Sequence, residues 1–123
     1  MITGVHTMFY SSEPEALRAF LRDKFDLPAT DVGHGWLIFD LPEAEMGVHP
    51  AGQTREAHGA PSGLHHISFY CDDIERTVAE LRAKGVEFTD EITDQEYGRT
   101  IHFKVPGGFE LELYQPHYRR NAK

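Results

Sequence analysis

Residues 63–88 read GLHHISFYCDDIERTVAELRAKGVEF, and residues 5–27 read VHTMFYSSEPEALRAFLRDKFDL. Offset by 60 positions without a gap, the two stretches agree at His6/His66, Phe9/Phe69, Tyr10/Tyr70, Glu15/Glu75, Ala19/Ala79, Leu21/Leu81, Arg22/Arg82 and Lys24/Lys84. The chain is therefore an internal duplication. Each copy is too small to bury its own sheet face, so the two copies are expected to pack together as one domain.

Each copy predicts a strand, a helix and then further strands. Ser12 is expected to cap the first helix, with Glu15 completing a capping box, and Asp72 and Glu75 repeat this pattern in the second copy. Gly85 is expected to end the second helix. The expected strands are residues 5–10, 29–32, 36–41 and 45–49 in the first copy, and residues 67–71, 86–88, 100–105 and 109–115 in the second.

The domain organisation follows from these copies. We expect a single domain over residues 1–123, with module 1 at about 1–52, a linker at 53–63 and module 2 at about 64–118. The linker region is rich in Gly, Ala and polar residues and lacks apolar periodicity. These features predict a connection and not a further element.

The composition excludes several classes of protein. A net charge of −8 argues against a nucleic-acid partner, whose phosphates would be repelled. No apolar run reaches the length of about 20 residues that a membrane span needs, and the first residues do not resemble a secretory signal. A single cysteine, Cys71, makes no internal disulfide and suits a reducing compartment. We therefore expect a cytoplasmic protein without a membrane or nucleic-acid partner.

Strand alternation predicts which side chains converge. In the second copy, His66, Ser68 and Tyr70 should lie on the sheet face away from the helix. The last strand should turn Glu110, Glu112 and Tyr114 to that same face. The duplicated first strand adds His6, so one concave sheet could gather two imidazoles and a carboxylate. Such a donor set suits a divalent transition metal with open positions for a substrate.

At these positions the chain resembles the vicinal oxygen chelate superfamily, from GVHTMFY (residues 4–10) to GFELELYQP (residues 108–116). That superfamily includes glyoxalase I, extradiol dioxygenases, fosfomycin-resistance enzymes and metal-free bleomycin-binding proteins. The resemblance implies an α+β fold in which two βαβββ modules form a curved eight-stranded mixed sheet with the helices on its outer face. Carried over residue by residue, it implies metal ligands at His6, His66 and Glu112.

Several roles stay open at this stage. In the stretch EAEMGVHP (residues 43–50), His49 could be a fourth metal ligand, an acid or base beside the metal, or a rim residue. A slip of one residue would exchange His65 for His66. His102 should share the metal face and is a candidate proton donor, and Arg99 or His102 could orient a substrate.

Two functions compete. The first is a metal-dependent lyase, isomerase or dioxygenase acting on a small oxygen-rich substrate, with Fe, Mn, Ni or Zn at His6, His66, Glu112 and His49, and with Glu112, His49 and His102 as catalytic residues. The second is a metal-free ligand-binding protein that resembles the bleomycin-resistance branch. In both cases we expect a homodimer, because an open sheet leaves strand edges that proteins generally cover.

Overall fold

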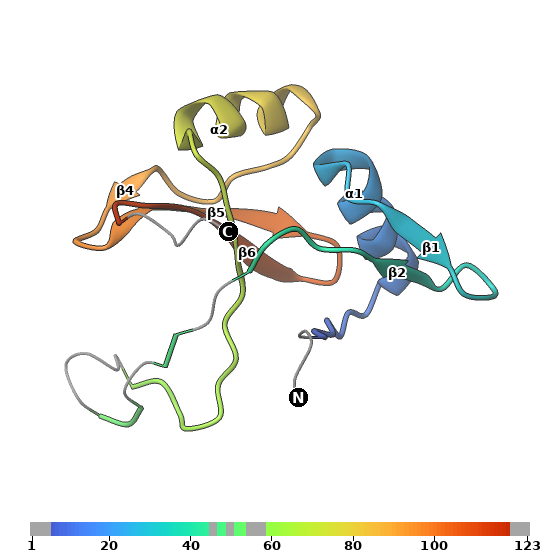
Figure 1. Cartoon of the computed structure of the whole chain (residues 1–123), viewed down its shortest axis with the longest axis horizontal. Helices are drawn as coiled ribbons and strands as arrows, with labels where there is room; N and C mark the ends of the chain where they lie inside the picture. Colours follow the sequence, from blue (N-terminus) through green and yellow to red (C-terminus); the bar gives the residue numbers. More distant parts are fainter. Residues whose placement is uncertain (1–5, 45–46, 49–50, 54–58, 119–123) are drawn as a thin grey trace.

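The computed structural model describes residues 6–44, 47–48, 51–53 and 59–118. This part of the chain folds into two helices and six strands (Figure 1), in the order α1 (Pro14–Phe25), β1 (Ala29–Asp31), β2 (Leu37–Phe39), β3 (Ser68–Tyr70), α2 (Ile74–Ala83), β4 (Thr93–Asp94), β5 (Gly98–Val105) and β6 (Phe109–Pro116). The fold is thus of the mixed α+β class. None of the described helices has the length and apolar character that crossing a membrane requires.

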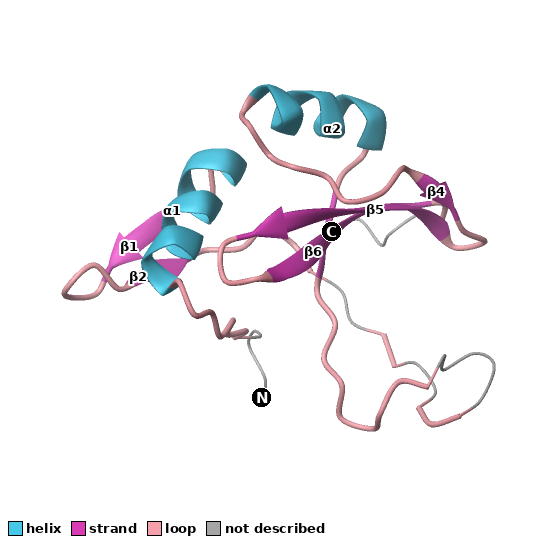
Figure 2. Cartoon of the chain, turned by 180° about the vertical axis from the view of Figure 1, so that it is seen from behind, coloured by secondary structure: helices cyan, strands magenta, loops and turns pink. Residues whose placement is uncertain are grey.

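The strands form two separate sheets. β1 and β2 pair antiparallel, and the larger sheet has the strand order β3-β6-β5-β4. In the larger sheet β3 runs parallel to β6, whereas β5 pairs antiparallel with both β6 and β4. Figure 1 and Figure 2 show α2 over one side of this sheet and α1 beside it, next to the β1–β2 pair. Residues 59–67, which lead into β3, extend from the side opposite α2.

The single eight-stranded sheet is not seen: within the described ranges there are six strands in two sheets. Residues 6–10, the described part of the strand expected at 5–10, form no ladder with the larger sheet, and a strand exists only where its backbone groups pair with a neighbour. The strand expected at 45–49 falls largely outside the described residues. The strand expected at 86–88 is reduced to one bridge between Phe88 and Phe103, and β4 was not expected.

Both helices begin one residue later than predicted. The cap of α2 is Asp73 and not Asp72, and its side chain accepts a hydrogen bond from the backbone N–H of Arg76 at 3.1 Å. The cap of α1 is Glu13 and not Ser12. Glu13 makes no side-chain cap; its carboxylate accepts a hydrogen bond from the backbone N–H of Gly107. The two caps still lie 60 positions apart, as the duplication requires.

The two copies also exchange hydrogen bonds at equivalent positions. Lys24 Nζ donates to the backbone carbonyl of Lys84 at 2.5 Å, and Lys84 Nζ donates to the carbonyl of Lys24 at 3.1 Å. Lys84 also pairs with Asp26 at 2.8 Å. Gly85 follows with φ +88, a left-handed conformation that glycine adopts readily, and α2 ends there as predicted.

The apolar core lies between the helices and one face of the β5–β6 pair. Buried members come from both helices, from the connection after α2 and from both strands: Leu17, Leu21, Ile74, Val78, Leu81, Val86, Ile101, Phe103, Val105, Leu111 and Leu113. Phe103 is fully buried and contacts Phe20 and Phe25 of α1, with ring centroids 6.3 Å and 5.5 Å away. Because both helices pack on this face, the alternate side chains of the strands are left for the opposite face.

Candidate functional site

The site is built around Glu112, on the sheet face that the helices leave free. In β6 the neighbours Leu111 and Leu113 point into the core, so Glu112 points the other way. Its strand partners are Ser68 of β3 and His102 of β5. Glu112 therefore lies on β6, the middle one of three adjacent strands, and only 15% of its side chain is exposed.

The two carboxylate oxygens of Glu112 have different partners. Oε1 accepts a hydrogen bond from Ser68 Oγ at 2.5 Å and lies 3.2 Å from His66 Nε2. Oε2 lies 3.1 Å from His102 Nε2. A half-buried carboxylate needs such donors, because removal from water disfavours its charge. The imidazoles of His66 and His102 thus approach one carboxylate from two sides.

Asp90 holds His102 from outside the sheet. Its Oδ1 accepts a hydrogen bond from the backbone N–H of His102, and its Oδ2 lies 2.8 Å from His102 Nδ1. Burial lowers the pKa of His102, but the hydrogen bond to Asp90 and the charges of Asp90, Glu112 and Glu110 outweigh it and raise the pKa above its usual value. The nearby carboxylates therefore stabilise the protonated form of this ring relative to an imidazole in water.

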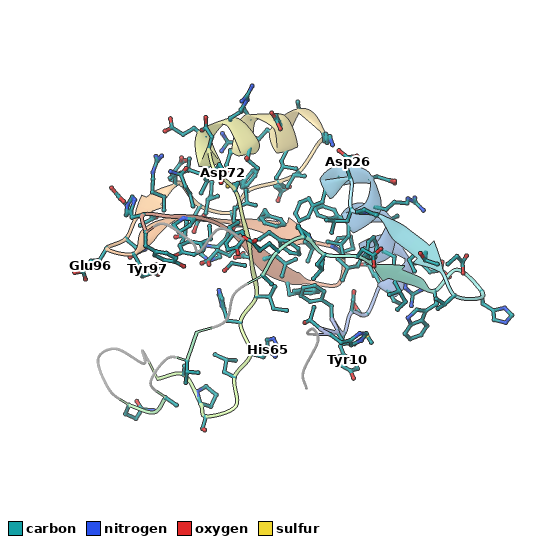
Figure 3. All side chains as sticks on the ribbon, viewed as in Figure 1. Tyr10, Asp26, His65, Asp72, Glu96 and Tyr97 are labelled. Atoms are coloured by element: carbon teal, nitrogen blue, oxygen red, sulfur yellow. The ribbon has the colours of Figure 1, made fainter. Side chains whose placement is uncertain are left out.

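A pocket of about 320 Å³ opens on this face. Its lining comes from residues 7–10, residues 65–67, His102 and residues 109–112. Figure 3 shows His65 and Tyr10 on the side of the sheet opposite α2. The wall combines apolar side chains such as Met8 and Phe109 with imidazoles and carboxylates, and within the described part of the chain it contains no Lys or Arg.

The structure brings some of the predicted site residues together and leaves others apart. His66, Glu112 and His102 come together, and His65, predicted to take the place of His66 only after a slip of one residue, lines the same pocket. His6 is exposed and does not line the pocket, although the adjacent Thr7 does. His49 lies outside the described residues. Among the residues that are described, no group of three His, Cys, Asp or Glu side chains has the geometry to hold a metal ion.

Arg99 has a structural partner. Its guanidinium forms an ion pair with Glu75 of α2 at 3.0 Å, and it is absent from the pocket lining. The predicted role in orienting a substrate therefore has no support from its position.

Sequence reasoning missed two residues near Glu112. Asp90 follows an irregular segment that β5 brings alongside His102, so no local pattern marks it. Tyr97 lies in the turn before β5, and its ring packs 5.9 Å from the ring of Tyr114. Burial raises the pKa of Tyr97, and the nearby charge of Glu112 raises it further. Contacts between segments reveal both neighbours, and no local pattern marks them.

Sequence comparison links the chain to a family. A profile described as "Glyoxalase/Bleomycin resistance protein/Dioxygenase superfamily" matches residues 4–113. The uncharacterized protein YaeR of Escherichia coli (strain K12) is 32% identical over 72 residues, which is 58% of this chain and 56% of that protein. The match thus spans little more than half the length of this relative.

Solved structures resemble the fold over most of its length. A lactoylglutathione lyase from Agrobacterium tumefaciens has a TM-score of 0.61 at 18% identity, covering 89% of this chain and 90% of its own. TnmS3, an antibiotic binding protein from Streptomyces sp. CB03234, has a TM-score of 0.62 at 20% identity, covering 94% and 99%. A superfamily member from Sphaerobacter thermophilus DSM 20745 has a TM-score of 0.59 at 23% identity, covering 93% and 98%. At these identities the likeness concerns the fold.

Proposed function

Because the chain belongs to the Glyoxalase/Bleomycin resistance protein/Dioxygenase superfamily, we propose that it is a metal-dependent enzyme acting on a small oxygen-rich molecule. The reaction class is lyase, isomerase or ring-cleaving dioxygenase chemistry. The observation that carries the proposal is the contact between His66 and Glu112, with His102 on the second oxygen of the same carboxylate. Imidazole and carboxylate together are typical ligands of divalent transition metals.

The donor set fits such a metal in chemistry and is incomplete in number. His66 and Glu112 supply two ligands, and no third one joins them among the described residues. We propose that His6, whose neighbour Thr7 lines the pocket, and His49 complete the set. In this arrangement residues 5–10 and 45–49 add two strands, which makes eight strands from two βαβββ modules.

Fe, Mn, Ni or Zn would suit these ligands. When bound, the metal supplies Lewis-acid chemistry and a template for two neighbouring substrate oxygens. Glu112 holds its Oε1 toward His66 with the help of Ser68, and His102 moves a proton beside Oε2. A pocket of about 320 Å³ is at the small end of the usual range for ligand sites, which favours a small substrate. We place the protein in the cytoplasm, since its single cysteine suits a reducing compartment.

Metal analysis tests the proposal. Protein prepared without a histidine tag should contain about one divalent metal per chain, and His66→Ala should remove most of it because the variant lacks a proposed ligand that contacts Glu112. His34→Ala is the matched control, since His34 lies in the turn between β1 and β2, outside the pocket lining. Substoichiometric metal that His66→Ala leaves unchanged would contradict the proposal.

A second function is favoured by the charge of the pocket. Glu110 and Glu112 line it, no Lys or Arg does so in the described part, and the whole chain carries −8. These features suit a basic ligand held without metal, and one structural relative is an antibiotic binding protein. Titration with a basic glycopeptide in the presence of chelator separates the two functions. Tight binding there favours sequestration, whereas binding that needs metal favours the enzyme.

A further inference from the structure

We propose that Asp90 is a positioning residue of this site, which fixes the His102 ring so that Nδ1 keeps its hydrogen and Nε2 is the atom that exchanges a proton at the pocket. The inference deepens the proposed function, because it assigns an atom to the proton transfer that the function requires. It concerns a residue that no sequence pattern marks and that lies outside the pocket lining.

Residues 89 and 90 hold His102 through several hydrogen bonds. Asp90 Oδ1 accepts from the backbone N–H of His102 at 2.8 Å, and Oδ2 lies 2.8 Å from the ring Nδ1. On the other side of the same residue, the backbone N–H of Thr89 donates to the carbonyl of His102 at 2.9 Å. Residues 89 and 90 therefore hold the backbone of His102 as well as the rotation of its ring.

The chemistry of the partner determines which nitrogen carries the hydrogen. A carboxylate accepts hydrogen bonds, so Nδ1 must donate to Asp90. In a neutral imidazole the other nitrogen then carries the lone pair, and here that nitrogen is Nε2. An aspartate that orients a histidine in this way, while the far nitrogen does the proton transfer, is the arrangement found in serine protease triads.

The second nitrogen of the His102 ring also contacts a carboxylate, so the position of the ring hydrogen has to be decided between the two. His102 Nε2 also faces a carboxylate, Glu112 Oε2, at 3.1 Å. The contact from His102 Nδ1 to Asp90 is shorter than the contact from Nε2 to Glu112. Glu112 also accepts a hydrogen bond from Ser68 and contacts His66, whereas both oxygens of Asp90 contact His102. We therefore assign the lasting N–H to the Asp90 side.

The two oxygens of Glu112 then face the two parts of the proposed chemistry, metal binding and proton transfer. Its Oε1, with Ser68 and His66, lies on the side assigned to the metal, and its Oε2 faces the nitrogen assigned to proton transfer. In the transfer itself, Nε2 takes a proton from the bound substrate while the electron pair of the broken bond stays on the substrate. The same nitrogen later returns the proton, and the hydrogen on Nδ1 does not move.

The chain contains a matched internal control. His117 uses its other nitrogen, Nε2, against Asp94 at 2.8 Å. The same reasoning predicts the opposite tautomer for His117, with the hydrogen on Nε2. The two histidines can be observed in one sample.

The experiment is long-range proton–nitrogen NMR of ¹⁵N-labelled, metal-free protein with chelator, in alkaline buffer where imidazole rings are neutral. We expect His102 to be hydrogenated at Nδ1 and His117 at Nε2. In Asp90→Asn, the amide has one acceptor oxygen for two donors, so His102 should lose its preference for Nδ1–H while His117 is unchanged. Asp94→Asn should do the reverse.

A wild-type spectrum with the His102 hydrogen on Nε2 would overturn the proposal, as would an Asp90→Asn spectrum in which Nδ1–H persists. If Asp90→Asn does not fold, the wild-type spectrum decides. The measurement needs no metal. A protein that binds no metal but shows Nδ1–H at His102 would therefore reject the proposed enzyme and keep the role of Asp90, and metal binding with Nε2–H would do the opposite.

Discussion

Among single residues, Glu112 is the one around which the polar side chains of the site are arranged. It is a mostly buried carboxylate whose two oxygens contact three polar side chains from β3, the segment before it and β5. Such a group is costly to leave without partners, because protein surroundings do not replace the lost water. The fold therefore supplies Ser68, His66 and His102 around it, and these same groups give the site its capacity for metal binding and proton transfer.

The raised pKa of His102 predicts a pH-dependent stability. Its folded pKa lies above the usual value of 6.5, so its contribution is fully present below about pH 6.5 and is lost as pH rises through the folded pKa. His102→Gln should therefore lower the urea midpoint of metal-free protein more near pH 6 than near pH 9. The same substitution in an Asp90→Asn background should show less pH dependence, since one of the two flanking charges is gone. An equal loss at both pH values would contradict the assignment.

Among the elements, both helices and the two long strands can be predicted from the sequence. The helices, β5 and β6 follow from apolar periodicity, and the alternation in β6 correctly assigns Glu112 to the face opposite the core. The start of each helix lies one residue beyond the predicted one, and at α1 the Glu13 carboxylate accepts a hydrogen bond from the distant Gly107, a contact that local patterns do not encode. The Asp90 contact was missed because it depends on pairing between segments 12 residues apart, which local patterns do not encode.

The helix ends carry a further trace of the duplication. Lys24 and Lys84 donate to each other's backbone carbonyls, which joins the C-terminal end of α2 to that of α1. We expect Lys84→Met to cost roughly 1 kcal/mol of unfolding free energy, since it removes two charge-assisted bonds that are partly exposed. Lys24→Met should cost less, because it removes one such bond.

Urea unfolding of the two single variants and the double variant measures this contact. Lys104→Met is the control, because Lys104 pairs with exposed Glu87 of the same half of the chain. A loss in Lys84→Met no larger than in the control would show that the contact does not hold the copies together.

At the scale of the whole molecule, the two halves differ within the part of the chain that the structure describes. There the second half forms a four-stranded sheet, while the first contributes α1 and the separate β1–β2 pair. A two-stranded sheet is marginal on its own. Large apolar side chains of the first half are exposed, among them Met8 at 47%, Tyr10 at 90% and Trp36 at 48%. These surfaces are suited to burial against another chain.

We therefore expect a homodimer. Light scattering coupled to size exclusion should give twice the chain mass of 14.0 kDa at micromolar concentration. Replacing Trp36 by Glu should shift the protein toward the monomer if this surface is covered, whereas Glu96→Lys, at an exposed site in the turn before β5, should not. A mass of one chain for the unchanged protein would contradict the expectation.

An anomalous difference map of metal-loaded crystals shows whether His66 and Glu112 bind one metal ion. We expect a peak within about 2.0–2.2 Å of His66 Nε2 and of a Glu112 oxygen, as for transition-metal ligands generally. The same map would show whether His6 or His49 completes the set. A metal-saturated protein with its peak elsewhere, or with no peak beside Glu112, would rule out a metal ion bound by these two residues.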